Sequence, residues 1–255
     1  MSVGQKLIES GVYGGYTDAA GTPTPAMLAE IKFVDGAIGQ FVNELKKNHL
    51  FGSTTIIITA KHGQSPIDNH RFFPIPGHSG ANGTPPSGLL GPSFLPDSEI
   101  NQIGPTEDDI SLLWLNPGTS TTDAVSLLET NATAAGIGQI LYGPSVEMMF
   151  GTPGLPAQGG DPRTPDIVVV PNVGVVYTGS TKKQSEHGGF ALDDTNVMLL
   201  VSNPSIRART ITTFVETTQV APTVLELLGL DPGKLDAVRK EGTAVLPGIG
   251  AGGRD

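Results

Sequence analysis

The sequence predicts an α/β fold in which a mostly parallel sheet is flanked by helices. Short apolar runs rich in β-branched residues alternate with longer segments that have apolar residues at helical spacing. The clearest unit is a helix that begins at Pro25, is capped by Thr24, and leads through a short turn into a strand at Thr54–Ala60. We expect this strand to share one sheet with the apolar strands Asp166–Pro171 and Asn196–Ser202.

Two segments rich in Gly, Pro and Ser divide the chain. Residues Asp68–Thr106 and Gly151–Thr164 show little periodicity and are predicted to be loops that border the functional site. Between them, residues 107–150 are expected to form a small inserted αβ cap. Residues 1–106 and 151–255 are then expected to form the α/β core.

The remaining elements follow from local patterns. Alternating or continuous apolar residues predict strands, and apolar residues at helical spacing predict helices. In order, they are a strand at Asp109–Leu115, a helix at Thr122–Ala134, short extended or helical pieces at Gly138–Tyr142 and Val146–Phe150, a strand at Val173–Tyr177, and an amphipathic helix within Val215–Gly229.

Composition limits the possible functions. The apolar content of 38% is enough for a globular core, and the absence of cysteine excludes disulfides and thiolate chemistry. A formal charge of −10 argues against a nucleic-acid-binding surface or general binding to anionic membranes. No apolar run approaches the roughly 20 residues of a membrane-spanning helix. The composition does not determine the cellular compartment.

Two His-Gly pairs stand next to strands of the predicted sheet. His62 follows the strand Thr54–Ala60, and His187 precedes the strand Asn196–Ser202. A histidine in a loop is most often an ordinary polar residue, but two such pairs beside one sheet predict a shared site. Imidazole is a good zinc ligand, and the adjacent glycine allows the backbone to approach a metal or phosphate closely. We expect the ring nitrogens of the two histidines to lie within about 8 Å of each other.

Other residues could complete such a site. Carboxylates are needed for a two-metal centre, although most of those available are expected to be helix caps or solvated loop charges. Lys182 and Lys183 could hold a substrate phosphate, or could simply be solvated. A G-x-S-x-G elbow, a phosphate-binding P-loop and a dinucleotide fingerprint are absent from the sequence, which argues against those classes. The carboxylate candidates are Asp18, Asp35, Asp68, Asp193 and Asp194.

Four motifs resemble a known family. TAKHG at the strand end is similar to the TxDHG motif of the alkaline phosphatase superfamily, in particular its type I phosphodiesterase/nucleotide pyrophosphatase branch. The helix FVDGAIGQFVNEL, the late EHGGF and the helix VETTQVAPTVLELLGLD resemble further motifs of that branch, in the same order over Phe33–Asp231. The resemblance implies an alkaline-phosphatase-like mixed, mostly parallel sheet. From its position between the two predicted loops, we expect the inserted cap to select the leaving group.

The resemblance also implies a chemistry. Families of this type hydrolyse phosphoric esters with two zinc ions that stabilise the attacking and leaving oxygens through a covalent phospho-enzyme. By motif position, His62 would bind the first metal and His187 the second, and Asp18 would belong to an Asp-x-x-x-His pair that binds the second. The expected substrate is a phosphate ester or another anionic small molecule. Relatives of this type are often exported.

The sequence departs from the family pattern at several positions. Lys61 stands where the motif has a metal-binding Asp, and Thr22 stands where the His paired with Asp18 is expected. An ammonium group cannot bind zinc and would repel it. The family's first strand and nucleophile would precede the residues matched here, so the chain resembles a carboxyl-terminal portion. We therefore expect at most one firmly bound zinc.

Three interpretations remain open. The chain could be part of a metal-dependent phosphodiesterase. It could instead be a catalytically inactive relative that binds an anionic ligand or a partner, with Lys61 as a fixed positive charge in place of a metal. A purely structural α/β domain would require all four motifs to be coincidental.

Overall fold

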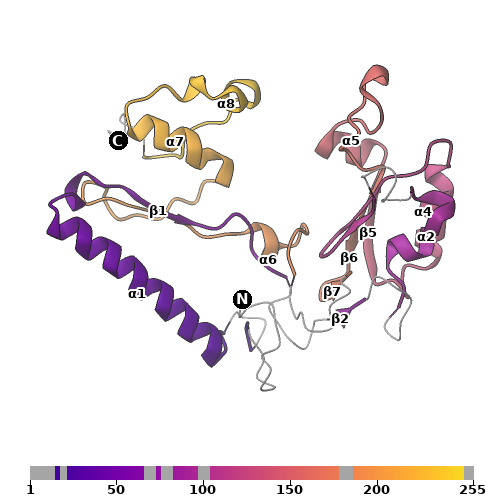
Figure 1. The fold of residues 1–255 in the computed structure, drawn as a ribbon, viewed down its shortest axis with the longest axis horizontal. Coiled ribbons are helices and arrows are strands. Elements are labelled where there is room, and N and C mark those ends of the chain that lie inside the picture. The colour runs from indigo at the N-terminus through magenta and orange to yellow at the C-terminus, as the bar shows by residue number, and fades with distance from the viewer. Residues whose placement is uncertain are drawn as a thin grey trace. The chain divides into compact units, whose positions relative to one another are not determined.

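The computed structural model describes residues 15–17, 22–65, 73–75, 83–96, 104–177 and 186–249. The chain divides into two compact units. The first consists of residues 1–34 and 62–196, and the second of residues 35–61 and 197–255. Helices and small sheets occur in both units (Figure 1), so the predicted α/β class is confirmed.

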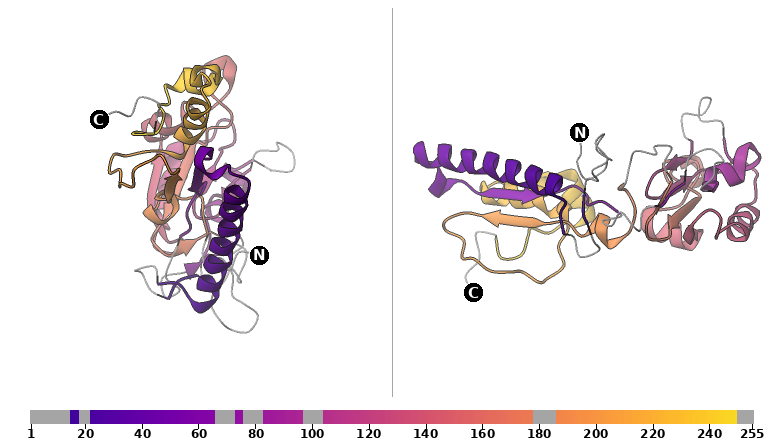
Figure 2. Two further views of the ribbon diagram at one scale, coloured as in Figure 1. Left: turned by 90° about the vertical axis from the view of Figure 1, so that its left-hand side faces the viewer. Right: turned by 90° about the horizontal axis from the view of Figure 1, so that it is seen from below.

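Helix α1, Pro25–Lys47, begins where the sequence predicts it. The hydroxyl of Thr24 accepts a hydrogen bond from the backbone N–H of Met27 at 3.2 Å, and proline occupies the first helical position, where no N–H is needed. Lys46 and Lys47 in the last turn interact favourably with the helix dipole. Figure 2 shows α1 as one uninterrupted helix. None of its residues is buried, although Phe41 and other apolar side chains lie along it.

The first unit is built on a four-stranded antiparallel sheet in the order β3-β4-β6-β5. Its strands are β3 (Thr106–Glu107), β4 (Ser111–Leu113), β5 (Ile137–Tyr142) and β6 (Ile167–Pro171). Helices α2 (Pro86–Phe94), α4 (Thr121–Thr130) and α5 (Pro144–Phe150) surround it (Figure 1). The described strands of the first unit also include a short parallel pair, β2 (Phe73–Pro74) with β7 (Val175–Val176).

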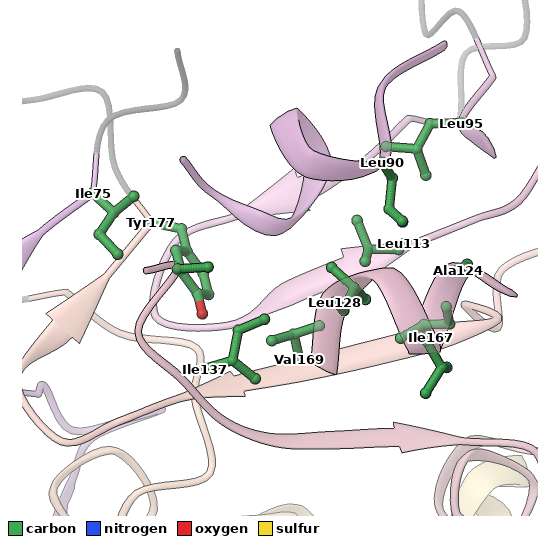
Figure 3. Close-up of a cluster of buried hydrophobic side chains, with 12 residues drawn as sticks. Ile75, Leu90, Leu95, Leu113, Ala124, Leu128, Ile137, Ile167, Val169 and Tyr177 are labelled. Atoms are coloured by element: carbon green, nitrogen blue, oxygen red, sulfur yellow. The ribbon is translucent and has the colours of Figure 1, made fainter. Parts of the chain in front are cut away.

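A hydrophobic core fills the space between this sheet and helices α2 and α4. Leu90 of α2 and Leu128 of α4 point towards Leu113 and Val169 of the sheet (Figure 3). Ser120 caps α4 by accepting a hydrogen bond from the N–H of Asp123 at 3.2 Å. A second, smaller cluster joins Ile110, Val146 and Val168.

The described part of the second unit contains an antiparallel strand pair, helix α7 and four shorter helical segments. Strand β1 (Ile56–Thr59) pairs with β8 (Leu199–Ser202), and the side chain of Asn203 donates to the carbonyl of Thr54 at 3.0 Å. The other elements are η1 (Phe51–Ser53), η3 (Thr217–Gln219), α7 (Val220–Leu227), η4 (Pro232–Lys234) and α8 (Asp236–Glu241). Both clusters of buried apolar residues found in the described ranges belong to the first unit.

The prediction that three apolar strands share one sheet is wrong. β1 and β8 pair with each other, whereas β6 lies in the four-stranded sheet of the other unit. The described pairings are also mostly antiparallel, with β2 and β7 as the parallel pair. An apolar run predicts burial, but neither the partner of a strand nor its direction is encoded in that run.

The segment Asp68–Thr106 is not the continuous loop that its composition predicts. It contains β2 and helix α2, which is kinked at Gly91, where φ is 57°. Glycine and proline lower the helix propensity of this stretch, but burial of Leu90 and Leu95 in the core stabilises it. The division into a core and a cap at 107–150 stays a prediction. Within the described residues, no helix has both the length and the apolar character needed to cross a membrane.

Candidate functional site

His62 and His187 lie together in the first unit. Their ring centroids are 3.8 Å apart and their planes are inclined by 23°, so the rings are stacked. The predicted convergence of the two His-Gly pairs is therefore confirmed.

Backbone hydrogen bonds of residues 63–65 bring the histidines together. The N–H of Ser65 donates to the carbonyl of Glu186 at 2.7 Å, and the N–H of Glu186 donates to the carbonyl of Ser65 at 2.5 Å. The N–H groups of Gly63 and Gln64 donate to the carbonyls of Asp194 and Asp193 at 2.6 and 2.9 Å. Segment 63–65, which follows His62, is therefore held against both sides of the loop that contains His187.

Glycine is required at position 63. A Cβ atom there would overlap the carbonyl oxygen of Asp193, a backbone atom that cannot move without breaking the adjoining hydrogen bonds. The glycine that follows His62 in the motif thus has a packing role in addition to any role near a ligand.

The hydrogen bonding of His62 leaves one ring nitrogen available. Its Nδ1 lies 2.8 Å from the carbonyl oxygen of Gly63. Because a carbonyl only accepts, Nδ1 bears the proton and Nε2 presents a lone pair in the neutral ring. Nε2 is buried and has no hydrogen-bond partner among the residues that the structure describes. On the other ring, Nε2 of His187 lies 3.9 Å from Oε1 of the buried Glu186.

The described residues do not form a zinc centre by themselves. The lone pair of His62 fits the role of one metal ligand, but structural zinc sites need about four ligands and catalytic sites about three. In the part of the chain that the structure describes, no group of three or more His, Asp or Glu residues could hold a metal ion. The family-implied ligand Asp18 lies outside the described residues.

Of the three lysines expected near the site, the structure describes Lys61. Lys61 directly precedes His62 in the chain and is exposed to solvent. Lys182 and Lys183 lie outside the described residues. The roles assigned to all three lysines therefore stay predictions.

A pocket of about 430 Å³ adjoins the loop of His187. It is lined by Gly188 and Phe190 of that loop, by Phe150 at the end of α5, and by Arg163. The rings of Phe150 and Phe190 are stacked with centroids 6.2 Å apart. Arg163 hydrogen bonds to Asp161 and holds the pKa of that carboxyl well below its usual range, to about 2. The Gly151–Thr164 segment thus borders this pocket.

A second pocket, of about 520 Å³, lies in the other unit. It is lined by residues of β8, by Arg207 and Arg209, and by apolar residues near Leu246. We assign the candidate site to the smaller pocket because that pocket includes the glycine next to His187, whereas size alone does not define a site. The sequence patterns did not single out Phe150, Phe190 or Arg163.

Two buried carboxyl groups lie behind the His187 loop. Asp109 and Asp194 are 5% and 3% exposed, so Asp194 is not one of the solvated loop charges expected among the carboxylate candidates. Burial, followed by the hydrogen bond and the charge of the neighbouring Asp194 carboxyl, raises the pKa of Asp109 to about 9.

The fold and the site define an α/β protein whose functional groups lie on loops between strands and helices. The family model described as type I phosphodiesterase / nucleotide pyrophosphatase matches residues 13–191, more than half of the chain. The chain therefore belongs to the type I phosphodiesterase / nucleotide pyrophosphatase family. The family assignment predicted from the sequence motifs is confirmed, and the matched residues include the first three of the four motifs.

Solved structures of similar fold are also known. Human ectonucleotide pyrophosphatase/phosphodiesterase 5 (ENPP5) is 16% identical with a TM-score of 0.57, covering 89% of this chain and 51% of the human one. Murine ENPP5 is 16% identical with a TM-score of 0.57, over 82% and 50% of the two chains. An inactive murine variant in complex with AMP is 15% identical with a TM-score of 0.56, over the same shares.

The chain thus spans about half the length of these solved structures. At this level of identity the likeness concerns the fold alone. Among curated proteins, none matches the sequence significantly.

We predict that Gly63→Ala will destabilise the first unit by about 1–3 kcal/mol, because the new methyl group displaces the Asp193 carbonyl. Thermal unfolding followed by the fluorescence of Trp114, the single tryptophan of the sequence, measures this change. Gly39→Ala is the control, since a Cβ at Gly39 within α1 meets nothing within 4 Å. Equal melting temperatures for Gly63→Ala and the unmodified protein would contradict the packing role.

Proposed function

We propose that the protein acts on phosphoric esters of the nucleotide type. The observation that carries this proposal is the stacked pair of His62 and His187, in which the Nε2 atom of His62 is buried without a partner, next to a pocket with two aromatic rings. Family membership supports the reaction class, and the AMP complex of the inactive murine ENPP5 variant supports the substrate class.

The pocket would take the base of the nucleotide. Phe150 and Phe190 offer apolar faces for stacking. Arg163 is a candidate guanidinium donor to a phosphate or a polar base edge, although its charge is balanced by Asp161 at the same pocket. The histidines would then lie on the phosphate side. In this arrangement Lys61, Lys182 and Lys183 are proposed as further positive charges for the anionic substrate, and residues 107–150 as the cap that selects the leaving group.

The proposal includes a metal-dependent activity. We propose that His62 and His187 each contribute one ring nitrogen to bound zinc, and that the remaining ligands, including Asp18, come from outside the described residues. Lys61, in place of the family's Asp, disfavours a second firmly bound ion. The described residues do not form a complete zinc site, so we assign no reaction step to zinc.

A second candidate function is the binding of an anionic ligand without hydrolysis. It is favoured by Lys61 at the position of a metal-binding Asp and by the absence of a three-ligand group among the described residues. Both candidates require the same pocket, so they differ in turnover and not in the location of the ligand.

Zinc titration by calorimetry is expected to give at most one firmly bound ion per chain. We propose that both histidines bind this single ion, so His62→Ala, which removes one of its two histidine ligands, should abolish the binding. His49→Asn is the matched control, because His49 is exposed and its positive φ of 57° is tolerated by asparagine. Lys61→Asp should raise the zinc stoichiometry towards two. Two equally tight sites in the unmodified protein would refute the role given to Lys61.

AMP binding tests the proposed substrate pocket. We expect Phe190→Ala to raise the Kd for AMP about tenfold or more, because the base loses one stacking contact. Met148→Ala is the control and should leave the Kd unchanged, because Met148 is exposed on α5. Hydrolysis of a p-nitrophenyl ester of AMP by the same preparation separates the two candidate functions. Turnover favours the hydrolase, binding without turnover favours the second candidate, and no AMP binding contradicts both.

A further inference from the structure

A pair of buried carboxyl groups lies in the first unit beside the His187 loop. Asp109 lies in the turn between β3 and β4, and Asp194 lies in the short helix α6, Leu192–Thr195. They are 5% and 3% exposed. Both carboxylate oxygens of Asp194 are buried and have no hydrogen-bond donor among the described residues, and the carboxyl of Asp109 lies within hydrogen-bonding reach of this side chain.

Gly189 lies against both acids. A Cβ atom on Gly189 would be 2.7 Å from Oδ2 of Asp194, 2.9 Å from the carbonyl oxygen of Asp109 and 3.4 Å from its Oδ2. Three oxygens from two distant segments thus surround the α-carbon of one residue, two positions after His187. The contact connects the β3–β4 turn, helix α6 and the His187 loop.

Two ionised carboxylates cannot stay in contact in this environment. Burial penalises each charge, and their mutual repulsion adds to that cost. The charged groups that act on Asp109 are all acidic: Asp194 from α6, Asp108 from the same turn, and Glu186 from the segment paired with Ser65. Burial first, and then the contact with Asp194, raise the pKa of Asp109. A protonated Asp109 would donate to Asp194, giving its oxygens the donor that they lack.

We propose that Asp109 and Asp194 share one proton, and that this shared proton fastens the His187 loop to the β3–β4 turn. Asp109 is thus a positioning residue for His187. The inference concerns the fold of the first unit and holds whether or not the protein hydrolyses phosphoric esters.

The pair makes folding depend on pH in a defined direction. In the unfolded chain Asp109 ionises near its ordinary pKa of 3.8, whereas in the folded chain its pKa is raised to about 9. Between these values the folded state holds a proton that the unfolded state has released. The stability that the pair contributes is therefore complete at low pH and is lost progressively as the pH rises towards 9.

The test compares Asp109→Asn with the unmodified protein in denaturant unfolding followed by Trp114 fluorescence. The samples contain EDTA and span about pH 5 to about pH 9. Asparagine keeps the shape and donates an N–H to Asp194 without titrating. Relative to Asp109→Asn, the unfolding constant of the unmodified protein should rise by up to about tenfold per pH unit. Asp108→Asn removes the same charge from the same turn and should keep the slope of the unmodified protein.

Asp109→Ala tests whether Asp109 positions the two histidines in addition to stabilising the fold. It removes the proton donor, so the ring signals of His62 and His187 in NMR spectra should shift, whereas Asp109→Asn should leave them in place. Parallel pH curves for the unmodified protein and Asp109→Asn would overturn the proposal. A pH slope that disappears when millimolar calcium or magnesium replaces EDTA would also overturn it, in favour of a cation between the carboxylates.

Discussion

The candidate site depends on the backbone pairing of segment 63–65 with Glu186 and with Asp193–Asp194. These hydrogen bonds join the residues after strand β1 to a loop more than a hundred positions later. Without them, His62 and His187 would be two separate loop histidines. Because the donors and acceptors are backbone groups, the pairing depends on side chains mainly through Gly63, where any Cβ would separate the two segments.

Around this pairing, several buried polar atoms have no partner within the described part of the chain. Nε2 of His62, the hydroxyl of Ser65 and the carboxylate of Asp194 all belong to this group. A buried polar atom without a hydrogen bond costs stability, so such a concentration is unusual in a region selected for folding alone. It is expected where side chains await a ligand or a proton. The lone pair of His62 is suited to a ligand, and the oxygens of Asp194 to a shared proton.

The sequence predicts the local features better than the long-range ones. Helix α1 could be predicted because Thr24, Pro25 and the apolar spacing act within a few residues. The meeting of His62 and His187 could be predicted because each His-Gly pair adjoins an apolar strand, and β1 does pair with β8. The separate sheet of β6 could not, since strand partners are chosen by packing across the whole chain. Helix α2 was obscured by its proline and glycine content. The burial of Asp109 and the pocket of Phe150 and Phe190 arise only when distant segments pack, and no local pattern marks them.

The most direct measurement of the central claim is the distance between the two imidazole rings in solution. With ring centroids 3.8 Å apart, strong nuclear Overhauser effects should connect the ring protons of His62 with those of His187 in the unmodified protein. The effects should vanish in Gly63→Ala, in which the backbone pairing is disrupted. A folded, unmodified protein whose histidine rings show no such effect would contradict the site described here.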